Sequence, residues 1–163
     1  GRTRTGIAIV SGGAVQFTST VQVGGGSLTD AIAKNLKISY EEAEKIKHEQ
    51  GISGENTNED LSLALMSTVS ILRDEINRHM EYWEKHNDDY GKKHPEIQKI
   101  YLCGGDSNLT GFTSYLASGM KCPVELANTM INVNKLDEYI PEISFNDSLR
   151  YATALGLSLR RSK

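Results

Sequence analysis

Residues 21–47 read VQVGGGSLTDAIAKNLKISYEEAEKIK, and within three glycines this stretch changes from a strand pattern to a helix pattern. Apolar, β-branched residues up to Val23 are typical of a strand. After the glycines, Leu28, Ile32 and Leu36 recur every four residues, which is the apolar stripe of a short helix. The stretch therefore predicts a strand that leads directly into a helix.

Two more helices are expected after this one. Ser39 and Glu42 match the S-x-x-E capping box and Gly51 supplies a stop, so we expect a helix over residues 40–50. From about Asn58 onward, apolar residues recur at spacings of three and four: Leu61, Leu65, Val69, Leu72, Ile76, Met80 and Trp83. This stripe predicts a long helix packed in the core, with a groove for a partner helix as the alternative.

Strands are predicted on both sides of these helices. Residues 5–23 carry β-branched positions around Gly12 and Gly13, a pattern typical of a β-hairpin. The last third predicts a strand in 97–105, a helix in 109–120, a short strand in 122–127 and a closing helix over 148–161. Alternating strands and helices indicate an α/β fold, in which the polar, helical stretch 48–97 resembles an insertion.

Composition excludes several classes of function. The chain has 163 residues, enough for one domain with a small insertion, and its net charge of −3 gives no broad positive surface for nucleic acid. Cys103 and Cys122 lie outside any C-x-x-C pair, which favours a reducing cytosol over a disulfide framework or a zinc site. No apolar run approaches the roughly 20 residues of a membrane span.

The first candidate site is the glycine turn at residues 1–6, called here the first turn. Backbone N–H groups there could approach an anion, with Thr3 or Thr5 adding a hydroxyl and Arg2 or Arg4 adding charge. The alternative is a frayed terminus with solvated basic residues.

Two further glycine turns join a strand to a helix. In the second turn, residues 24–26, a helix N-terminus could bind phosphate, or a flexible turn could be capped by Ser27 or Thr29. In the third turn, Gly104 and Gly105 follow an apolar strand, and its carboxyl end is where open α/β sheets bind ligands. An ordinary strand-to-helix turn is the alternative there.

Other chemistry is poorly supported by the sequence. The four histidines form no H-E-x-x-H or Cys/His set, so solvated side chains are expected rather than metal ligands. No Ser/His/Asp arrangement or close carboxylate pair indicates a hydrolase. Glu44 and Lys47 are expected to form an exposed ion pair one helical turn apart.

Taken in order, four stretches resemble the C-terminal half of the actin-like ATPases. They are residues 1–10, 21–47, 100–116 and 152–160, and the most specific run is G-G-x-x-L-T-x-x-I-A, followed by A-E-x-x-K at residues 43–47. The resemblance is closest to the PilM family of type IV pilus assembly proteins, with the cell-division protein FtsA next. It implies an α/β, actin-like (RNase H-like) ATPase domain II, with a mixed sheet flanked by helices and a helical insertion. The larger subdomain IIA would comprise about 1–47 and 98–163, and the inserted subdomain IIB about 48–97.

The resemblance also implies ATP with Mg²⁺ as the ligand. The first turn would be the tail of the second phosphate-binding hairpin, and the second turn would flank the nucleotide cleft. The Glu44–Lys47 pair would reach the ribose or adenine, and the third turn would form the adenosine motif. The nucleotide-binding residues implied in this way are Gly1, Thr3, Thr5, Gly24, Gly25, Glu44, Lys47, Gly104, Gly105 and Asp106, with no catalytic residue and no metal ligand among them.

The chain also departs from the family pattern. The family has an Asp and an apolar residue before the Gly of the first turn, at the end of a strand in the centre of the sheet, and this sequence starts at that Gly. Phosphoryl transfer is therefore not expected from this chain alone. Small residues are usual in the family where this chain has Arg2, Arg4 and Asp106, and Asp106 could repel phosphate.

Three functions remain open at this stage. The first is an ATP-binding cytoplasmic scaffold of pilus assembly, in which nucleotide closes the cleft between two halves. Its partners would be ATP and PilN-like inner-membrane proteins, reached through the N-terminal half of the family, and self-association stays open. The second is an interaction module of the same fold that binds no nucleotide. The third, an FtsA-like division protein, would need a C-terminal amphipathic helix, for which residues 155–163 are too short.

Overall fold

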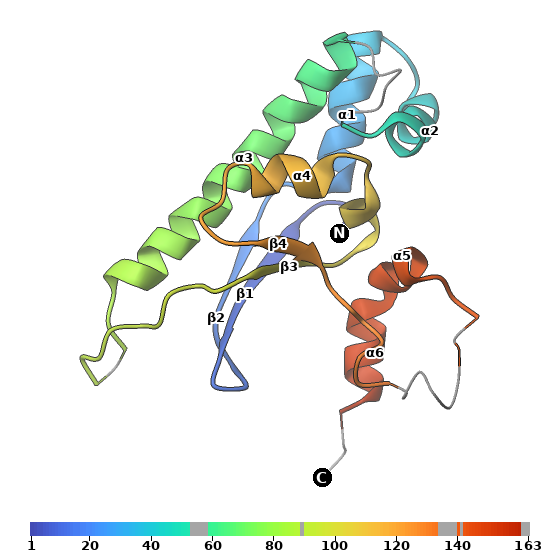
Figure 1. The fold of residues 1–163 in the computed structure, drawn as a ribbon. Helices are drawn as coiled ribbons and strands as arrows, with labels where there is room; N and C mark the ends of the chain where they lie inside the picture. Colours follow the sequence, from blue (N-terminus) through green and yellow to red (C-terminus); the bar gives the residue numbers. More distant parts are fainter. Residues whose placement is uncertain (53–58, 89, 134–139, 141, 161–163) are drawn as a thin grey trace.

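The computed structural model describes residues 1–52, 59–88, 90–133, 140 and 142–160. In chain order the elements are β1 (Thr5–Ser11), β2 (Ala14–Val21), α1 (Gly25–Leu36), α2 (Tyr40–Gln50), α3 (Glu59–Lys85), β3 (Ile100–Leu102), η1 (Gly105–Asn108), α4 (Phe112–Ala117), β4 (Val124–Leu126), α5 (Phe145–Ser148), η2 (Leu149–Tyr151) and α6 (Ala152–Ser158). Figure 1 shows α1, α2 and the beginning of α3 together at one end, with the four strands below them. The α/β class predicted from the sequence is confirmed.

The predicted hairpin is formed by β1 and β2, which pair antiparallel. Gly12 and Gly13 form its turn with φ angles of 59° and 78°, and consecutive positive φ angles favour glycine at both positions. The register shifts between Ile9 and Val10, which marks a β-bulge. The outer edge of β1 is left without a strand partner in the described part of the chain.

The second strand pair, β3 and β4, is parallel and connected through α4. Among the described residues the strands form two separate two-stranded sheets, so the antiparallel and parallel pairings of a mixed sheet are both present, but β1 and β3 are not paired. The predicted strand over 97–105 is shorter in the structure, because only Ile100, Tyr101 and Leu102 have partners in β4.

Two helices differ from their predicted bounds. The helix predicted over 109–120 is preceded by the 3₁₀ turn η1 and starts at Phe112, after Gly111 with a φ of 81°. The closing helix begins earlier than residue 148, because Ser144 accepts a hydrogen bond from the Asp147 N–H and starts α5. It also ends earlier than predicted, at Ser158 with Leu159 as the C-cap residue, and the predicted last residue, 161, lies outside the described residues.

The hydrophobic core is built around α3, as its apolar stripe predicts. Leu61, Leu65, Val69 and Leu72 pack with Ile32 in one cluster of buried side chains, which also includes Val21, Leu28, Ala43, Ile52, Leu109, Phe112, Leu116 and Val124. Full burial of a Leu or Ile side chain contributes about 2 kcal/mol to stability. The core is thus shared between α3 and residues on both sides of the proposed insertion, so the subdomain bounds at 48 and 97 stay a prediction. The predicted start of this helix, near Asn58, is outside the described residues.

The short helix α2 follows its predicted bounds. The Ser39 hydroxyl accepts a hydrogen bond from the Glu42 N–H at 3.2 Å, and the Ser39 N–H donates to the Glu42 carboxylate at 3.0 Å. Gly51 ends the helix with a φ of 65°. The capping box read from the sequence is confirmed. None of the helices that the structure describes has the length and apolarity needed to cross a bilayer.

Candidate functional site

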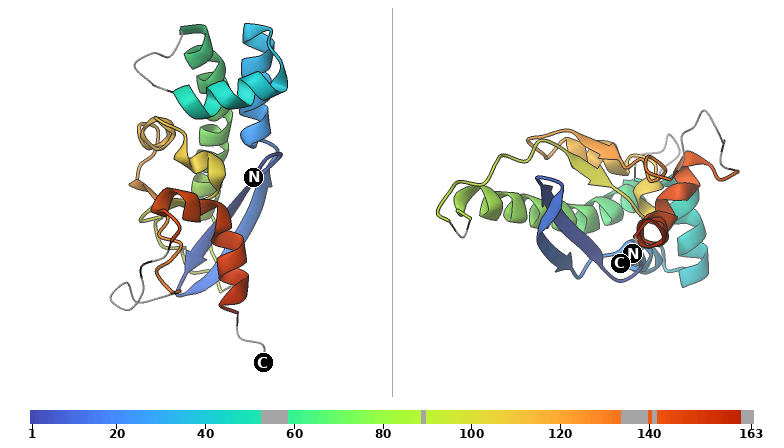
Figure 2. Two further views of the ribbon diagram at one scale, coloured as in Figure 1. Left: turned by 90° about the vertical axis from the view of Figure 1, so that its right-hand side faces the viewer. Right: turned by 90° about the horizontal axis from the view of Figure 1, so that it is seen from below.

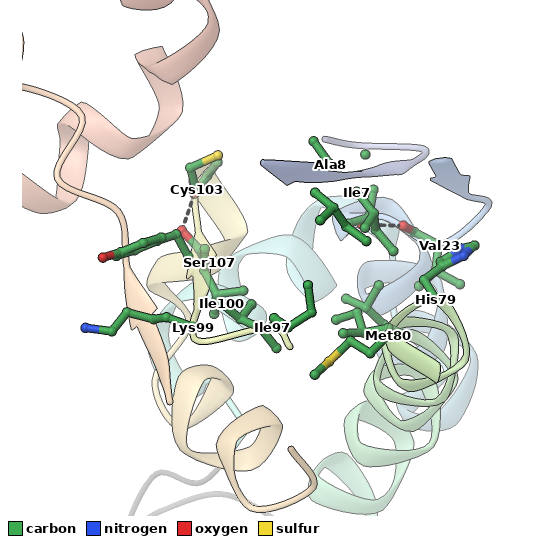
Figure 3. Close-up of a pocket in the computed structure, with 18 of the residues that line it drawn as sticks. Ile7, Ala8, Val23, His79, Met80, Ile97, Lys99, Ile100, Cys103 and Ser107 are labelled. Atoms are coloured by element: carbon green, nitrogen blue, oxygen red, sulfur yellow. Dashed lines mark hydrogen bonds between the residues drawn. The ribbon is translucent and has the colours of Figure 1, made fainter. Parts of the chain in front are cut away.

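A cavity of about 860 Å³ lies between β1 and β3, the two strands whose facing edges are unpaired. Figure 3 shows Ile7 of β1, Met80 of α3 and Ile100 of β3 around this space. Most of the lining is apolar, but one end is formed by the glycine turns: Gly1, Thr5, Gly24, Gly25, Gly104, Asp106 and Ser107. The structure therefore brings residues from all three turns to one end of a single cavity. In Figure 2 the N-terminus lies next to the start of α1.

The second turn is packed against the first. The N–H of Gly25 donates to the carbonyl of Gly1 at 3.0 Å, and the N–H of Gly26 donates to the carbonyl of Arg2 at 2.7 Å. A Cβ atom on Gly24 would lie 2.4 Å from the Gly1 carbonyl oxygen, so the close approach requires glycine. These two amide groups at the start of α1 are already occupied by the chain's own carbonyl groups.

The first turn is held by backbone and side-chain contacts. The Thr5 hydroxyl donates to the Val23 carbonyl at 2.7 Å, and the Arg2 guanidinium lies 5.2 Å from the centre of the Tyr40 ring. Arg2 and Tyr40 thus make a cation–π contact between the first turn and α2. Thr3 is exposed and is not part of the cavity lining.

Behind the second turn, Lys47 is the most unusual residue of the site. Its ammonium group contacts Glu44 at 2.9 Å, Asp106 at 2.9 Å and the Thr29 hydroxyl at 3.1 Å, and its side chain is only 2% exposed. An ammonium has three N–H donors, so these three partners can satisfy it. The prediction of an exposed Glu44–Lys47 pair is wrong, because α1 and Asp106 cover the lysine.

Glu44 links this buried group to the surface. Its carboxylate accepts hydrogen bonds from Thr29, Lys47 and His48, and its side chain is 38% exposed. Burial acts to raise the pKa of Glu44, but the hydrogen bond from Thr29, the hydrogen bond and charge of Lys47, and the His48 contact together lower it below 4.5. Glu44 is therefore ionised at neutral pH.

The third turn places glycine and a carboxylate beside the same cluster. Gly104 has a φ of 103° and donates its N–H to the Leu149 carbonyl at 2.9 Å, a conformation that favours glycine. The Ser107 hydroxyl donates back to the Gly104 carbonyl at 2.6 Å. A Cβ on Gly105 would have no neighbour within 4 Å, so the chain itself gives no steric reason for this glycine.

The structure thus brings only some of the ten residues predicted to bind the nucleotide together at the cavity. Six of them line the cavity, Glu44 and Lys47 lie directly behind its polar end, and Thr3 and Gly105 are not in its lining. Sequence reasoning missed the part that Thr29 plays in holding Lys47. Thr29 is three residues before Ile32, on the apolar stripe of α1, and a hydroxyl on a buried stripe is a signal for a buried polar partner.

Within the residues that the structure describes, nothing supports a metal ion held by protein side chains alone. No group of three or more His, Cys, Asp and Glu residues there has the arrangement to hold an ion.

Comparison with known proteins identifies a family. The family described as "Type IV pilus assembly protein PilM" matches residues 1–162. The chain belongs to the PilM family of type IV pilus assembly proteins. No curated protein matches the sequence.

Solved structures support the fold of this PilM family member. A structure described as a PilM–PilN type IV pilus biogenesis complex matches with a TM-score of 0.75 and 22% identity over 98% of this chain. The ethanolamine utilization protein EutJ from Carboxydothermus hydrogenoformans matches with a TM-score of 0.65 and 20% identity over 96% of this chain. The actin-like ATPase fold is therefore shown. This chain spans 43% and 45%, respectively, of the two matched chains.

Proposed function

We propose that this chain is the nucleotide-facing part of an actin-like cytoplasmic scaffold protein in type IV pilus assembly. In this proposal ATP with Mg²⁺ closes the cleft between this part and the other half of the protein. Membership of the PilM family supports the role in pilus assembly. The observation that carries nucleotide binding is the meeting of three glycine turns at one end of a cavity, beside the Glu44–Lys47 pair.

The sugar and base of a nucleotide fit the residues present. Glu44 is ionised and partly exposed, so its carboxylate can accept hydrogen bonds from ribose hydroxyl groups. Gly105 leaves open space above its backbone, where a flat adenine ring could approach. The family resemblance gives the same two roles to the Glu44–Lys47 pair and to the third turn.

The phosphates would not be bound by the N–H groups at the start of α1, as they are at a simple helix N-terminus. The N–H groups of Gly25 and Gly26 already donate to carbonyl groups of the first turn, so they are not free for phosphate in this arrangement. We assign the phosphate contacts to the exposed first turn, where Thr3 and Arg4 lie at the surface. Bound ATP would supply the phosphate oxygens that hold Mg²⁺, and the two halves would close around them.

The apolar remainder of the cavity fits a β-strand. It lies between the unpaired edges of β1 and β3 and is lined by apolar side chains such as Ile9, Leu72 and Leu102. An apolar strand that pairs with both edges would join the two sheets into one and bury these side chains. We propose that residues preceding Gly1 in the full-length polypeptide form this strand, as the resemblance implies.

The proposed partner is a PilN-like protein of the inner membrane. The support is the similarity to the PilM–PilN type IV pilus biogenesis complex, which concerns a chain more than twice as long. The contact would be made through the other half of the protein, which places this chain at the cytoplasmic face of the membrane.

Alkylation of Cys103 in the full-length protein tests nucleotide binding at this site. Cys103 is exposed in this chain and directly precedes Gly104 of the third turn, whereas Cys122 does not line the cavity and serves as an internal control. ATP–Mg²⁺ at ten times its dissociation constant should slow iodoacetamide modification of Cys103 about tenfold, because only free protein reacts. The rate at Cys122 should not change. Equal Cys103 rates with and without millimolar ATP–Mg²⁺ would contradict the proposal.

A second candidate function is an interaction module that binds no nucleotide. Two observations favour it: Asp106 already forms an ion pair with Lys47, and the first N–H groups of α1 already donate hydrogen bonds to carbonyl groups of the first turn. In this case Cys103 would react at the same rate with ATP–Mg²⁺, while a PilN-like partner would still bind.

A further inference from the structure

The buried Lys47 has no donor left for a ligand. Its ammonium lies within hydrogen-bond distance of Glu44, Thr29 and Asp106, and 3.3 Å from the Gly25 carbonyl oxygen. A new acceptor can reach this group only if one of these oxygens leaves. The question is therefore which partner can leave most easily.

Asp106 is the partner that differs from the others. Glu44 lies one turn away on the same helix, and Thr29 and Gly25 belong to the well-packed helix α1. Asp106 comes from the third turn, its side chain is 30% exposed, and Lys47 is the ion-pair partner that the structure gives its carboxylate. Its side chain can rotate toward solvent without moving a helix.

The Asp106 carboxylate also fills the space that Gly25 provides. A Cβ atom on Gly25 would lie 2.0 Å from Asp106 Oδ2, so the carboxylate lies directly against the glycine backbone. Glycine at the start of a helix normally allows a ligand to approach the backbone closely. At this helix an internal anion takes that place, in contact with the lysine that a ligand would use.

The charges at this point disfavour an incoming anion. Glu44 and Asp106 face the single ammonium of Lys47, which leaves one excess negative charge when both carboxylates are ionised. The guanidinium of Arg2 lies over the Tyr40 ring, and the imidazole of His48 contacts Glu44 Oε1. Removal of the Asp106 charge alone would make the pair of Glu44 and Lys47 neutral.

We propose that Asp106 is a built-in competitor for the nucleotide, and that its carboxylate must leave Lys47 before ATP can bind there. Asp106 thereby sets the affinity of the site. This inference rests on the proposed nucleotide-binding function. A residue of the adenosine motif would be expected to strengthen nucleotide binding, whereas Asp106 weakens it.

Two substitutions in the full-length protein separate charge from size. D106N keeps the shape and removes the charge, whereas D106S also removes the bulk beside Gly25. We expect D106N to lower the dissociation constant of ATP–Mg²⁺ about tenfold, equivalent to about 1.4 kcal/mol. E81Q is the matched control: it also removes one negative charge and one lysine ion pair, at 3.0 Å, but lies on α3 and should leave the affinity unchanged.

A second measurement needs no nucleotide. Lys47 should resist reductive methylation in the wild-type protein, since its side chain is buried, and should react faster in D106S, where the covering carboxylate is gone. Mass spectrometry of the peptide that contains Lys47 gives the rate. Circular dichroism checks that each variant is folded.

The outcomes distinguish this inference from the proposed function. If D106N binds ATP–Mg²⁺ as tightly as the wild type, or more weakly, Asp106 is not a competitor, while nucleotide binding itself stands. An unchanged Lys47 methylation rate in D106S would likewise overturn the inference. If neither the wild type nor D106N binds nucleotide at millimolar concentration, the proposed function fails and the inference fails with it.

Discussion

Substitution of Lys47 by methionine should destabilise the protein far more than a typical surface lysine would. The change keeps the length of the side chain but removes an ammonium that contacts Glu44, Asp106 and Thr29. Breaking a fully buried ion pair costs about 3–5 kcal/mol, because an uncompensated charge remains. Glu44 and Asp106 are 38% and 30% exposed, so water can partly solvate them after the change. We therefore expect a loss of about 2–3 kcal/mol in the free energy of unfolding.

Urea unfolding at pH 7, followed by circular dichroism, measures this loss. K45M is the matched control: Lys45 lies on the same helix, is 74% exposed and is 3.9 Å from Glu49, so its replacement should cost less than about 0.5 kcal/mol. At pH 3 the loss in K47M should shrink, because the lowered pKa of Glu44 makes its pairing with Lys47 a contribution to stability that is lost as the pH falls. If K47M and K45M lose the same stability at pH 7, Lys47 is not a buried structural charge and the reasoning fails.

Three further predictions concern the glycines, the pH dependence and the thiols. G24A should destabilise the protein by about 1–3 kcal/mol in urea unfolding, since its Cβ would clash with backbone, whereas G105A should leave stability within about 0.5 kcal/mol. Because the pKa of Glu44 is lowered in the folded state, its contribution to stability is present above pH 4.5 and is lost as the pH falls through the lowered value. The free energy of unfolding of E44Q should therefore change less between pH 7 and pH 3 than that of the wild type. Burial, and then the charge of a nearby glutamate, raises the pKa of Cys122, so at pH 8 iodoacetamide should modify the exposed Cys103 about tenfold faster, and equal rates would contradict this.

Local patterns in the sequence predict most of the helices and the hairpin. The capping box at Ser39 and the glycine stop at Gly51 depend on neighbouring residues alone, and both are found in the structure. The stripe on α3 likewise predicts its buried face from helical periodicity. The strand pairs were harder to predict, because β3 has only three residues paired with β4 and its length depends on a partner distant in sequence.

The burial of Lys47 could not be predicted from residues around it. A Glu and a Lys one turn apart are usually exposed, and the sequence of α2 does not show that α1 and the third turn cover this pair. Asp106 lies 59 residues after Lys47, so their 2.9 Å contact is a property of the fold. The three glycines of the second turn have a similar origin: a Cβ on Gly24 or Gly26 would meet the backbone of the first turn, and a Cβ on Gly25 would meet the Asp106 carboxylate.

The central claim is that ATP–Mg²⁺ binds at Glu44, beside the polar end of this cavity, and calorimetric titration of the full-length protein tests it most directly. We predict saturable binding by the wild type and by E49Q, and binding at least about tenfold weaker in E44Q, which loses the carboxylate offered to the ribose. Glu49 is a suitable control because it is an exposed residue of the same helix with its own lysine partner. No binding by the wild type at millimolar ATP–Mg²⁺, or equal binding by E44Q, would contradict the claim.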